Sequence, residues 1–297
     1  MEDNGVCRRW LIPREGMRLV QLAILESEFS PEVLLRRLLD EGYEARLSTS
    51  APERVIVVAE PPSLSRLSES VTDYVLSDWI AGYVLQLLSH EHDYLSAEDR
   101  EYVGLLASHT FRMGTGASGF GLWRDKIRDI IRAVLVRSGS VNIRGILRFR
   151  AGEFLRAIDV QLTDVVQHFL ADREYEEFVS MLRVMLDAQP PSTQTLHLYC
   201  TDQRVWICDE GGNLVRDREV AKAAHEASED GEVDAEDLAM SILIMKSPCR
   251  IIIHDLAEGA TWPSFAQTVE RVFLERASRC EHCSTCDKLR RAASDGT

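Results

Sequence analysis

The sequence predicts an α+β fold with a small N-terminal α/β unit, a central helical domain and a C-terminal α/β unit. Apolar and β-branched runs at residues 17–26 and 53–60, and again at 195–210 and 250–255, are typical of strands. Between them, nearly every apolar residue of 63–190 falls at helical spacing. Double prolines at 61–62 and 190–191 separate the regions. We therefore expect domains at 1–62, 63–191 and 192–279, followed by a Cys-rich tail at 280–297.

In the N-terminal unit, FSPEVLLRRLLDEG between the first two strands predicts a helix. Ser30 is a candidate N-cap, Pro31 suits the first helical position, and Gly42 follows the last. Its expected buried stripe consists of Val33, Leu34, Leu35, Leu38 and Leu39.

The central domain is expected to contain several amphipathic helices. Ser96 is a candidate cap for one of them. The first helix presents Val71, Tyr74, Val75, Trp79 and Tyr83 on one face; another presents Phe154, Ile158, Val165 and Phe169; a further one presents Tyr175, Phe178, Leu182 and Met185 or Leu186.

The C-terminal unit begins with a predicted hairpin, TLHLYC and QRVWICDE, followed by an acidic segment that we expect to be a solvated loop. A helix at about 235–245, the strand RIIIHD and a last helix opening near Trp262 and Pro263 complete the unit.

Composition excludes several classes of protein. The chain has 48 acidic and 34 basic side chains and a net charge of −14, which disfavours nonspecific attraction to nucleic acid or anionic lipid. No apolar run approaches the ~18 residues of a membrane span, and the first ten residues lack the apolar core of a signal peptide. We expect a cytoplasmic protein with no membrane partner. Its seven cysteines are then thiols or metal ligands rather than disulfides.

The most specific motif is RCEHCSTCDKL at 279–289, with Cys280, Cys283 and Cys286 at three-residue spacing. These three cannot reach one ion from a straight helix, because i, i+3 and i+6 spread over about 120° and climb roughly 9 Å. A turn would let the thiolates converge on zinc, with His282, Cys249, Cys208 or a partner's side chain as fourth ligand. The alternative, which the sequence leaves open, is a mobile tail with three reduced, exposed thiols. Zinc is preferred over an iron–sulfur cluster, whose usual fourth cysteine and following proline are missing.

Two other motifs lack the context that their chemistry needs. GTGASG at 114–119 matches a dinucleotide-binding loop, but a helix rather than a strand is predicted before it. We therefore interpret it as a connection between helices. HEHD at 90–93, and His254 with Asp255 at the end of a strand, place imidazoles beside carboxylates without a recognisable nucleophile. We interpret both as polar residues of loops or strand ends.

A basic stripe covers residues 124–156, with nine basic and three acidic side chains. Arg124, Arg128 and Arg132 share one helical face and could bind nucleic acid or an acidic partner. We prefer the alternative that they face water or pair with acids of this chain, such as Asp172, Glu174, Glu176 and Glu177.

The segment from Val141 to Arg216 resembles the YtxC-like family, described as sporulation proteins of endospore-forming bacteria. The resemblance is strongest in NIRGILRFR, FLADREYEEFVSMLR and the double proline. It implies a cytosolic, sporulation-associated protein and transfers no catalytic residue.

Three functions follow from these observations. Because the sequence contains no complete catalytic set, we prefer a non-enzymatic protein that binds another macromolecule, most simply a protein. The alternatives are a nucleic-acid-binding protein that uses the basic stripe and a metal-dependent enzyme built around the C-terminal cysteines and His254.

Overall fold

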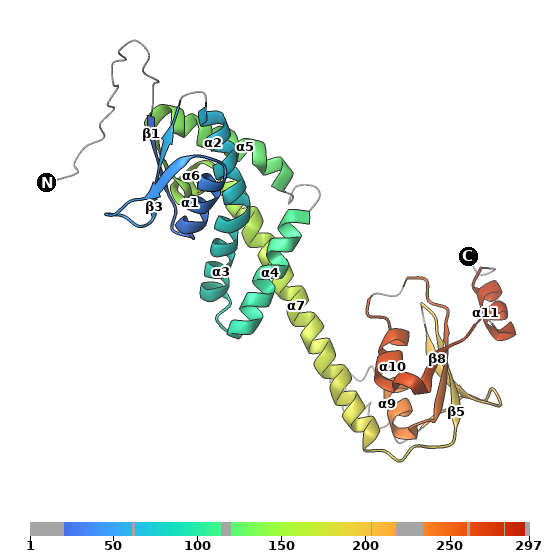
Figure 1. Ribbon diagram of the computed structural model, residues 1–297. Helices are drawn as coiled ribbons and strands as arrows, with labels where there is room; N and C mark the ends of the chain where they lie inside the picture. Colours follow the sequence, from blue (N-terminus) through green and yellow to red (C-terminus); the bar gives the residue numbers. More distant parts are fainter. Residues whose placement is uncertain are drawn as a thin grey trace, which may run out of the picture. The chain divides into compact units, whose positions relative to one another are not determined.

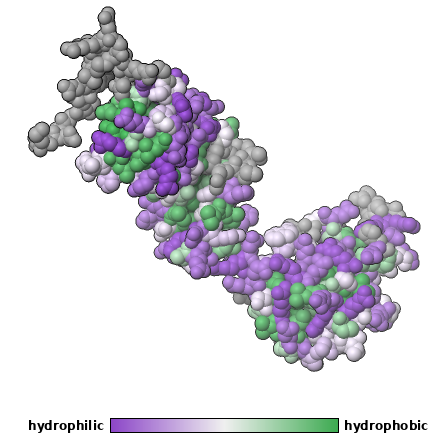
Figure 2. Space-filling view, in the orientation of Figure 1, coloured by the Kyte–Doolittle hydropathy of each residue, from purple (hydrophilic) through white to green (hydrophobic). Residues whose placement is uncertain are grey.

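The computed structural model describes residues 21–60, 63–113, 120–202, 204–217, 234–259, 262–281 and 283–294. These residues form an α+β protein, as predicted, with two small mixed sheets and a majority of helix. The chain divides into two compact units, residues 1–170 and 171–297 (Figure 1). In the space-filling view the visible surface of each unit is mostly hydrophilic, with smaller hydrophobic patches (Figure 2).

The first unit contains a four-stranded sheet in the order β2-β3-β1-β4. Strands β1, β2 and β3 are antiparallel neighbours, whereas β4 pairs with β1 in parallel, Ile24 opposite Ser140. The elements of the sheet are β1 (Gln21–Glu26), α1 (Pro31–Asp40), β2 (Glu44–Leu47), β3 (Arg54–Ala59) and β4 (Ser140–Asn142). The short strands β2 and β4 are not evident in the sequence.

The helix α1 begins and ends where its sequence predicts, but two details differ. Ser30 occupies the N-cap position with a φ of 44° and makes no side-chain capping bond. The helix start is therefore favoured by Pro31, whose fixed φ suits the first helical position, and not by a capping side chain. Only Leu34 and Leu38 of the expected stripe are fully buried, Leu35 packs partly buried against the core, and Val33 and Leu39 are exposed.

The helices of the first unit share one core with its sheet. The predicted face of the first long helix is confirmed, since Val71, Tyr74, Val75 and Trp79 are fully buried. A π-helical turn interrupts this helix, and Ser96 caps α4 through the amide of Asp99 at 3.0 Å. The helical elements are α2 (Leu64–Tyr74), the π turn (Val75–Trp79), α3 (Ile80–Glu91), α4 (Ala97–Met113), α5 (Phe120–Ser138), α6 (Ile143–Arg150) and α7 (Gly152–Asp187).

The two amphipathic segments predicted after residue 152 are one continuous helix, α7. Its first half buries Ile158, Leu162 and Val166 in the core of the first unit. Its last turns bury Val179, Leu182 and Leu186 in the core of the second unit, whereas Phe178 and Met185 are exposed. The predicted boundaries after residues 62, 191 and 279 stay predictions.

The second unit contains a sheet in the order β6-β5-β7-β8. Strands β5 and β6 form the predicted hairpin, and β5, β7 and β8 run parallel. Figure 1 shows α9 and α10 on one side of this sheet and α11 on the other. The elements are β5 (Thr195–Cys200), β6 (Val205–Asp209), α9 (Ala235–Lys246), β7 (Arg250–Asp255), α10 (Phe265–Phe273), a 3₁₀ turn (Leu274–Arg276), β8 (Ala277–Arg279) and α11 (Ser284–Ser294).

The two faces of this sheet bury different side chains. Leu196 and Leu198 of β5 and Ile251 and Ile253 of β7 are fully buried in the hydrophobic core. Because successive side chains of a strand alternate between faces, His254 points to the opposite face. It is nevertheless buried, with 3 % of its surface exposed. Something other than the hydrophobic core must therefore cover it.

Candidate metal centre

The groups that lie close to His254 are three cysteines. His254, Cys280, Cys283 and Cys286 each offer one ligand atom, and these four atoms all lie within 4.8 Å of one another. The three predicted cysteines are thus brought together. The residue beside them is a histidine 26 positions before Cys280 in the sequence.

Backbone pairing in the sheet positions two of the four groups. Ile253 of β7 pairs with Arg279 of β8, and the Cys280 amide donates to the Ile253 carbonyl oxygen at 2.8 Å. His254 and Cys280 therefore follow directly from a hydrogen-bonded pair of parallel strands. Their approach depends on strand register, which is fixed by the buried side chains on the other face.

The start of α11 positions the other two groups. The Asp287 amide donates to the Cys283 carbonyl oxygen at 3.2 Å, so Cys283 stands immediately before the first turn and Cys286 lies within it. Cys286 is buried, with 2 % of its surface exposed. The three cysteines do not lie in one straight helix. Cys280 follows the end of a strand, and Cys283 and Cys286 lie at the start of a helix, so their side chains can converge. The preceding helix α10 ends at Phe273, before the first of the three cysteines.

The distances fit a single tetrahedral ion. Bonds of ~2.3 Å to sulfur and ~2.0 Å to nitrogen place two sulfur ligands roughly 3.8 Å apart, and sulfur and nitrogen roughly 3.5 Å apart. The sulfur atoms of Cys283 and Cys286 are 3.7 Å apart. The Nδ1 atom of His254 lies 3.2 Å from Cys286 Sγ and 3.7 Å from Cys283 Sγ. This spacing suits one ion and leaves no room for a cluster of several irons between the ligands.

The electrostatics of the site favour the ligating forms of Cys283 and His254 but not, without a cation, that of Cys286. The backbone amide of Cys286, at the start of α11, lowers the pKa of the Cys283 thiol to about 7. Burial, and after it the side-chain hydrogen bond with Cys283, raises the pKa of Cys286 to about 11, so this thiol stays protonated near neutral pH without a cation. Burial, with His197 as neighbour, lowers the pKa of His254, so its ring is neutral and able to ligate.

A row of stacked rings supports His254 from the sheet. Its ring centroid lies 4.2 Å from that of Tyr199, which is itself 5.2 Å from Trp206. His197, two residues before Tyr199 on β5, stacks on His254 at 5.2 Å, and its Nδ1 atom lies 2.9 Å from His254 Nε2. An Nε2–H that donates to His197 leaves Nδ1 of His254 as the ligand atom, directed at the cysteines.

The other candidate ligands stand outside this group. His282 lies outside the described residues. Cys249 is exposed, and its thiol donates to the Gln194 carbonyl oxygen at 3.3 Å. Cys208 belongs to β6 and is not among the four residues whose ligand atoms converge. Asp255, the neighbour of His254, pairs with Arg279 at 3.0 Å.

The remaining sequence motifs are not brought to the metal centre. In HEHD, the His92 ring bonds the Tyr94 hydroxyl at 2.8 Å on the surface of the first unit. The GTGASG loop lies outside the described residues, and the segment before it is the helix α4, as predicted.

The basic stripe pairs partly with acids of the chain, although not with those named from the sequence. Arg124 pairs with Asp73 at 2.5 Å. Arg128 pairs with Asp125 at 2.8 Å and contacts Asp129 at 3.4 Å. Arg132 is exposed and makes no ion pair with any residue that the structure describes.

The fold and the site define an α+β protein with a tetrad of potential metal ligands at the edge of its second sheet. The sequence model of the YtxC-like family matches residues 65–278, so the chain belongs to this family. No curated protein and no solved structure matches the chain significantly. No helix in the described parts of the chain is both long and apolar enough to cross a membrane.

Proposed function

We propose that this protein is a non-enzymatic, macromolecule-binding protein of the cytosol of sporulating cells, whose C-terminal unit holds a structural zinc ion. The observation that supports the zinc ion most directly is the convergence of His254, Cys280, Cys283 and Cys286 within 4.8 Å. The sporulation setting comes from the YtxC-like family, to which the chain belongs.

The composition of the tetrad supports a structural role for the ion. Four protein ligands complete the tetrahedral coordination of zinc, whereas catalytic zinc sites keep one position open for water or substrate. Three thiolates and an imidazole form one of the common structural sets. His254, the residue that a metal-dependent enzyme would use as acid or base, is here a ligand, and its second nitrogen faces His197.

The ion would join two separate pieces of structure. His254 and Cys280 belong to the sheet, and Cys283 and Cys286 belong to the start of α11. A bound zinc ion would thus fasten α11 to the sheet, and the free energy of binding would contribute to the folding of this unit.

Metal analysis of the full chain, purified anaerobically, tests the zinc site. We expect about one zinc per chain and little iron. Changing Cys280, Cys283 and Cys286 together to serine should bring zinc close to zero, whereas Cys249→Ser, at an exposed cysteine outside the tetrad, should leave it unchanged. Metal close to zero in the parent protein, or equal metal in the triple variant, would contradict the site.

Two further measurements test the biological part of the proposal. Deletion of the gene in its endospore-forming host should lower the number of heat-resistant spores, and an unchanged number would argue against a role in sporulation. Turnover of a small-molecule substrate that His254→Ala abolishes, without loss of folding, would refute the non-enzymatic role.

A further inference from the structure

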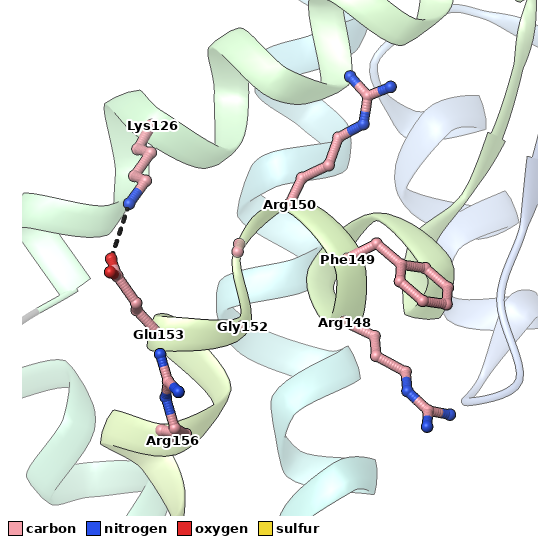
Figure 3. A pocket seen from close by; sticks show the side chains of 8 residues that line it. Lys126, Arg148, Phe149, Arg150, Gly152, Glu153 and Arg156 are labelled. Carbon is pink, nitrogen blue, oxygen red and sulfur yellow. Dashed lines mark hydrogen bonds and ion pairs between the residues drawn. The ribbon is translucent and has the colours of Figure 1, made fainter.

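A cavity of about 460 Å³ lies where α6 ends and α7 begins. It belongs entirely to the first unit, and most of its lining is charged. Figure 3 shows Lys126, Glu153 and Arg156 to one side of the junction, and Arg148 with Phe149 to the other. We call this cavity the junction groove. It is lined by Lys126, Arg148, Phe149, Arg150, Ala151, Gly152, Glu153 and Arg156.

The junction groove carries an uncompensated positive charge. Lys126 is held by Glu153 at 3.2 Å and lies over the ring of Trp123 at 4.9 Å. The three other cations are exposed and make no ion pair in the described structure: Arg148, Arg150 and Arg156. A surplus of three positive charges thus gathers at one place in a chain of net charge −14. Such a local field attracts an anion even though the whole chain repels one.

The backbone adds a second source of positive potential. The junction groove contains Gly152, the first residue of α7. The amides of Phe154 and Leu155 donate to the Ala151 carbonyl oxygen at 2.9 and 3.4 Å, which leaves the amides of Gly152 and Glu153 without a backbone partner in the described structure. The partial positive charge at the start of α7 therefore lies beside Arg156, while the C-terminal end of the shorter α6, which carries Arg148 and Arg150, has the opposite sign. A Cβ atom built on Gly152 would meet nothing within 4 Å, so a ligand can approach this backbone closely.

An exposed aromatic ring stands among the cations. Phe149 exposes 81 % of its surface, and the guanidinium of Arg148 lies 5.8 Å from its ring centroid. Exposed aromatic rings beside basic side chains stack with unpaired bases, at about 1–3 kcal/mol per base. The arginines in this part of the basic stripe face water without ion pairs to any described residue, as the preferred alternative expects. The exposed Phe149 ring beside them is the feature that distinguishes this part from an ordinary solvated face.

We propose that the junction groove binds single-stranded nucleic acid, with phosphates on Arg150, Arg156 and the start of α7, and a base stacked on Phe149. This inference rests on the proposed macromolecule-binding function and names the class of partner. A small anion fits less well, because small-molecule sites are mainly apolar and enclose their ligand. Phe149 and Arg156 point to different sides of the junction, so a ligand of several nucleotides is needed to reach both. A duplex offers no exposed base face to Phe149.

Fluorescence anisotropy with the full chain tests this proposal. The probes are a labelled 12-nucleotide oligothymidine, a 12-nucleotide RNA of mixed sequence and the matching DNA duplex, each over a series of salt concentrations. We expect the single strands to bind more tightly than the duplex. Each lost phosphate contact lowers the salt slope of a single strand by about 0.7. The double variant Arg150→Gln, Arg156→Gln should therefore weaken binding and lower the slope by about 1.4.

Two sets of variants distinguish binding in the junction groove from nonspecific attraction to positive charge elsewhere on the surface. The double variant Arg36→Gln, Arg46→Gln removes the same charge from exposed arginines that make no ion pair in the described structure, and should bind like the parent. Phe149→Ala should weaken binding by about fivefold or more, from the lower end of the stacking range, and Phe149→Tyr should retain it. All these positions are exposed, so thermal melting of the variants should match that of the parent.

Several results would overturn the proposal: no binding at low salt, equal binding by the groove variants and the Arg36/Arg46 control, or equal affinity for duplex with no effect of Phe149→Ala. Binding to vesicles of phosphatidylserine and phosphatidylcholine without binding to oligonucleotide would instead assign the groove to a membrane surface. The triple cysteine variant, altered in the other unit, should bind oligonucleotide normally. A negative result for nucleic-acid binding in the junction groove can thereby be distinguished from a negative result for the zinc site.

Discussion

The hydrogen bond between His197 and His254 allows a specific test of the metal centre. His197 is not one of the four proposed ligands, so it can be changed while all four are kept. Its half-buried Nδ1 atom lies 2.9 Å from His254 Nε2. If His254 binds zinc through Nδ1, its Nε2–H must donate to His197. The perturbation that we consider is His197→Leu, which removes this acceptor and leaves the four ligands in place.

The expected size of the effect follows from the role of such an acceptor. Groups that accept the second N–H of a ligating histidine fix its tautomer and raise its basicity, and their loss costs about 10- to 100-fold in metal affinity. This corresponds to about 1.4–2.8 kcal/mol. The ring of His197 also stacks on that of His254 at 5.2 Å, and leucine removes the stacking as well.

A matched variant separates the two contributions. In His197→Asn the side-chain oxygen can take roughly the place of Nδ1, so the acceptor is kept while the stacking ring is lost. We expect His197→Asn to stay within about threefold of the parent affinity, because one hydrogen bond of this kind outweighs the stacking of the half-buried His197 ring.

The assay is competition for zinc between the protein and a chromophoric chelator at fixed pH under reducing conditions. Equal affinities of the parent and His197→Leu would refute the argument, since His254 would then not depend on the acceptor. Equal and large losses in both variants would assign the effect to stacking or packing rather than to the hydrogen bond.

Two further predictions concern the core of the first unit. A Cβ atom at Gly82 would lie 2.6 Å from Cγ of Phe29, so Gly82→Ala should lower the free energy of unfolding by about 1–3 kcal/mol in urea titrations. Gly121→Ala, in a helix with nothing within 4 Å, should instead raise it by about 0.5–1 kcal/mol, and the same sign for both would contradict the steric argument. Burial raises the pKa of the Asp159 carboxyl, opposed by a hydrogen bond from Tyr83 at 3.3 Å. The folded state therefore disfavours the charged form, and this carboxyl lowers stability as pH rises from its unfolded value of ~4 through its raised folded value. Asp159→Asn should thus gain stability relative to the parent between pH 3.5 and 7, whereas a difference independent of pH would contradict the prediction.

Sequence patterns predict those helices and strands whose own apolar residues recur with a clear periodicity. The helices around Trp79 and Ile158 and the strands 54–59 and 250–255 have such patterns, and the structure places them as expected. Strands β2, β4 and β8 have three or four residues each, too few to show alternation. Their conformation is set by a neighbouring strand, which is information that a local pattern does not contain.

The same distinction applies to the metal centre. The three cysteines are close in sequence, so their spacing indicates a candidate metal site if the chain turns between them. His254 joins them only because β8 pairs with β7, and β8 is one of the strands that the sequence does not predict. The available signal is the alternation in RIIIHD, which places His254 on the face opposite Ile251 and Ile253. The junction groove, in turn, depends on an end-to-end arrangement of α6 and α7.

The parallel pairing of β1 with β4 has a consequence for the order in which the protein folds during synthesis. Ile24 of β1 cannot pair with Ser140 of β4 until the ribosome has added Ser140, more than a hundred residues later. At about 5–20 residues per second, that delay is roughly 6–23 s. Until then β1 has an unpaired edge, with Leu22 exposing much of its side chain even in the finished fold. Helices α2 to α5 are synthesised in this interval, so the nascent chain carries the open edge of β1 until β4 emerges.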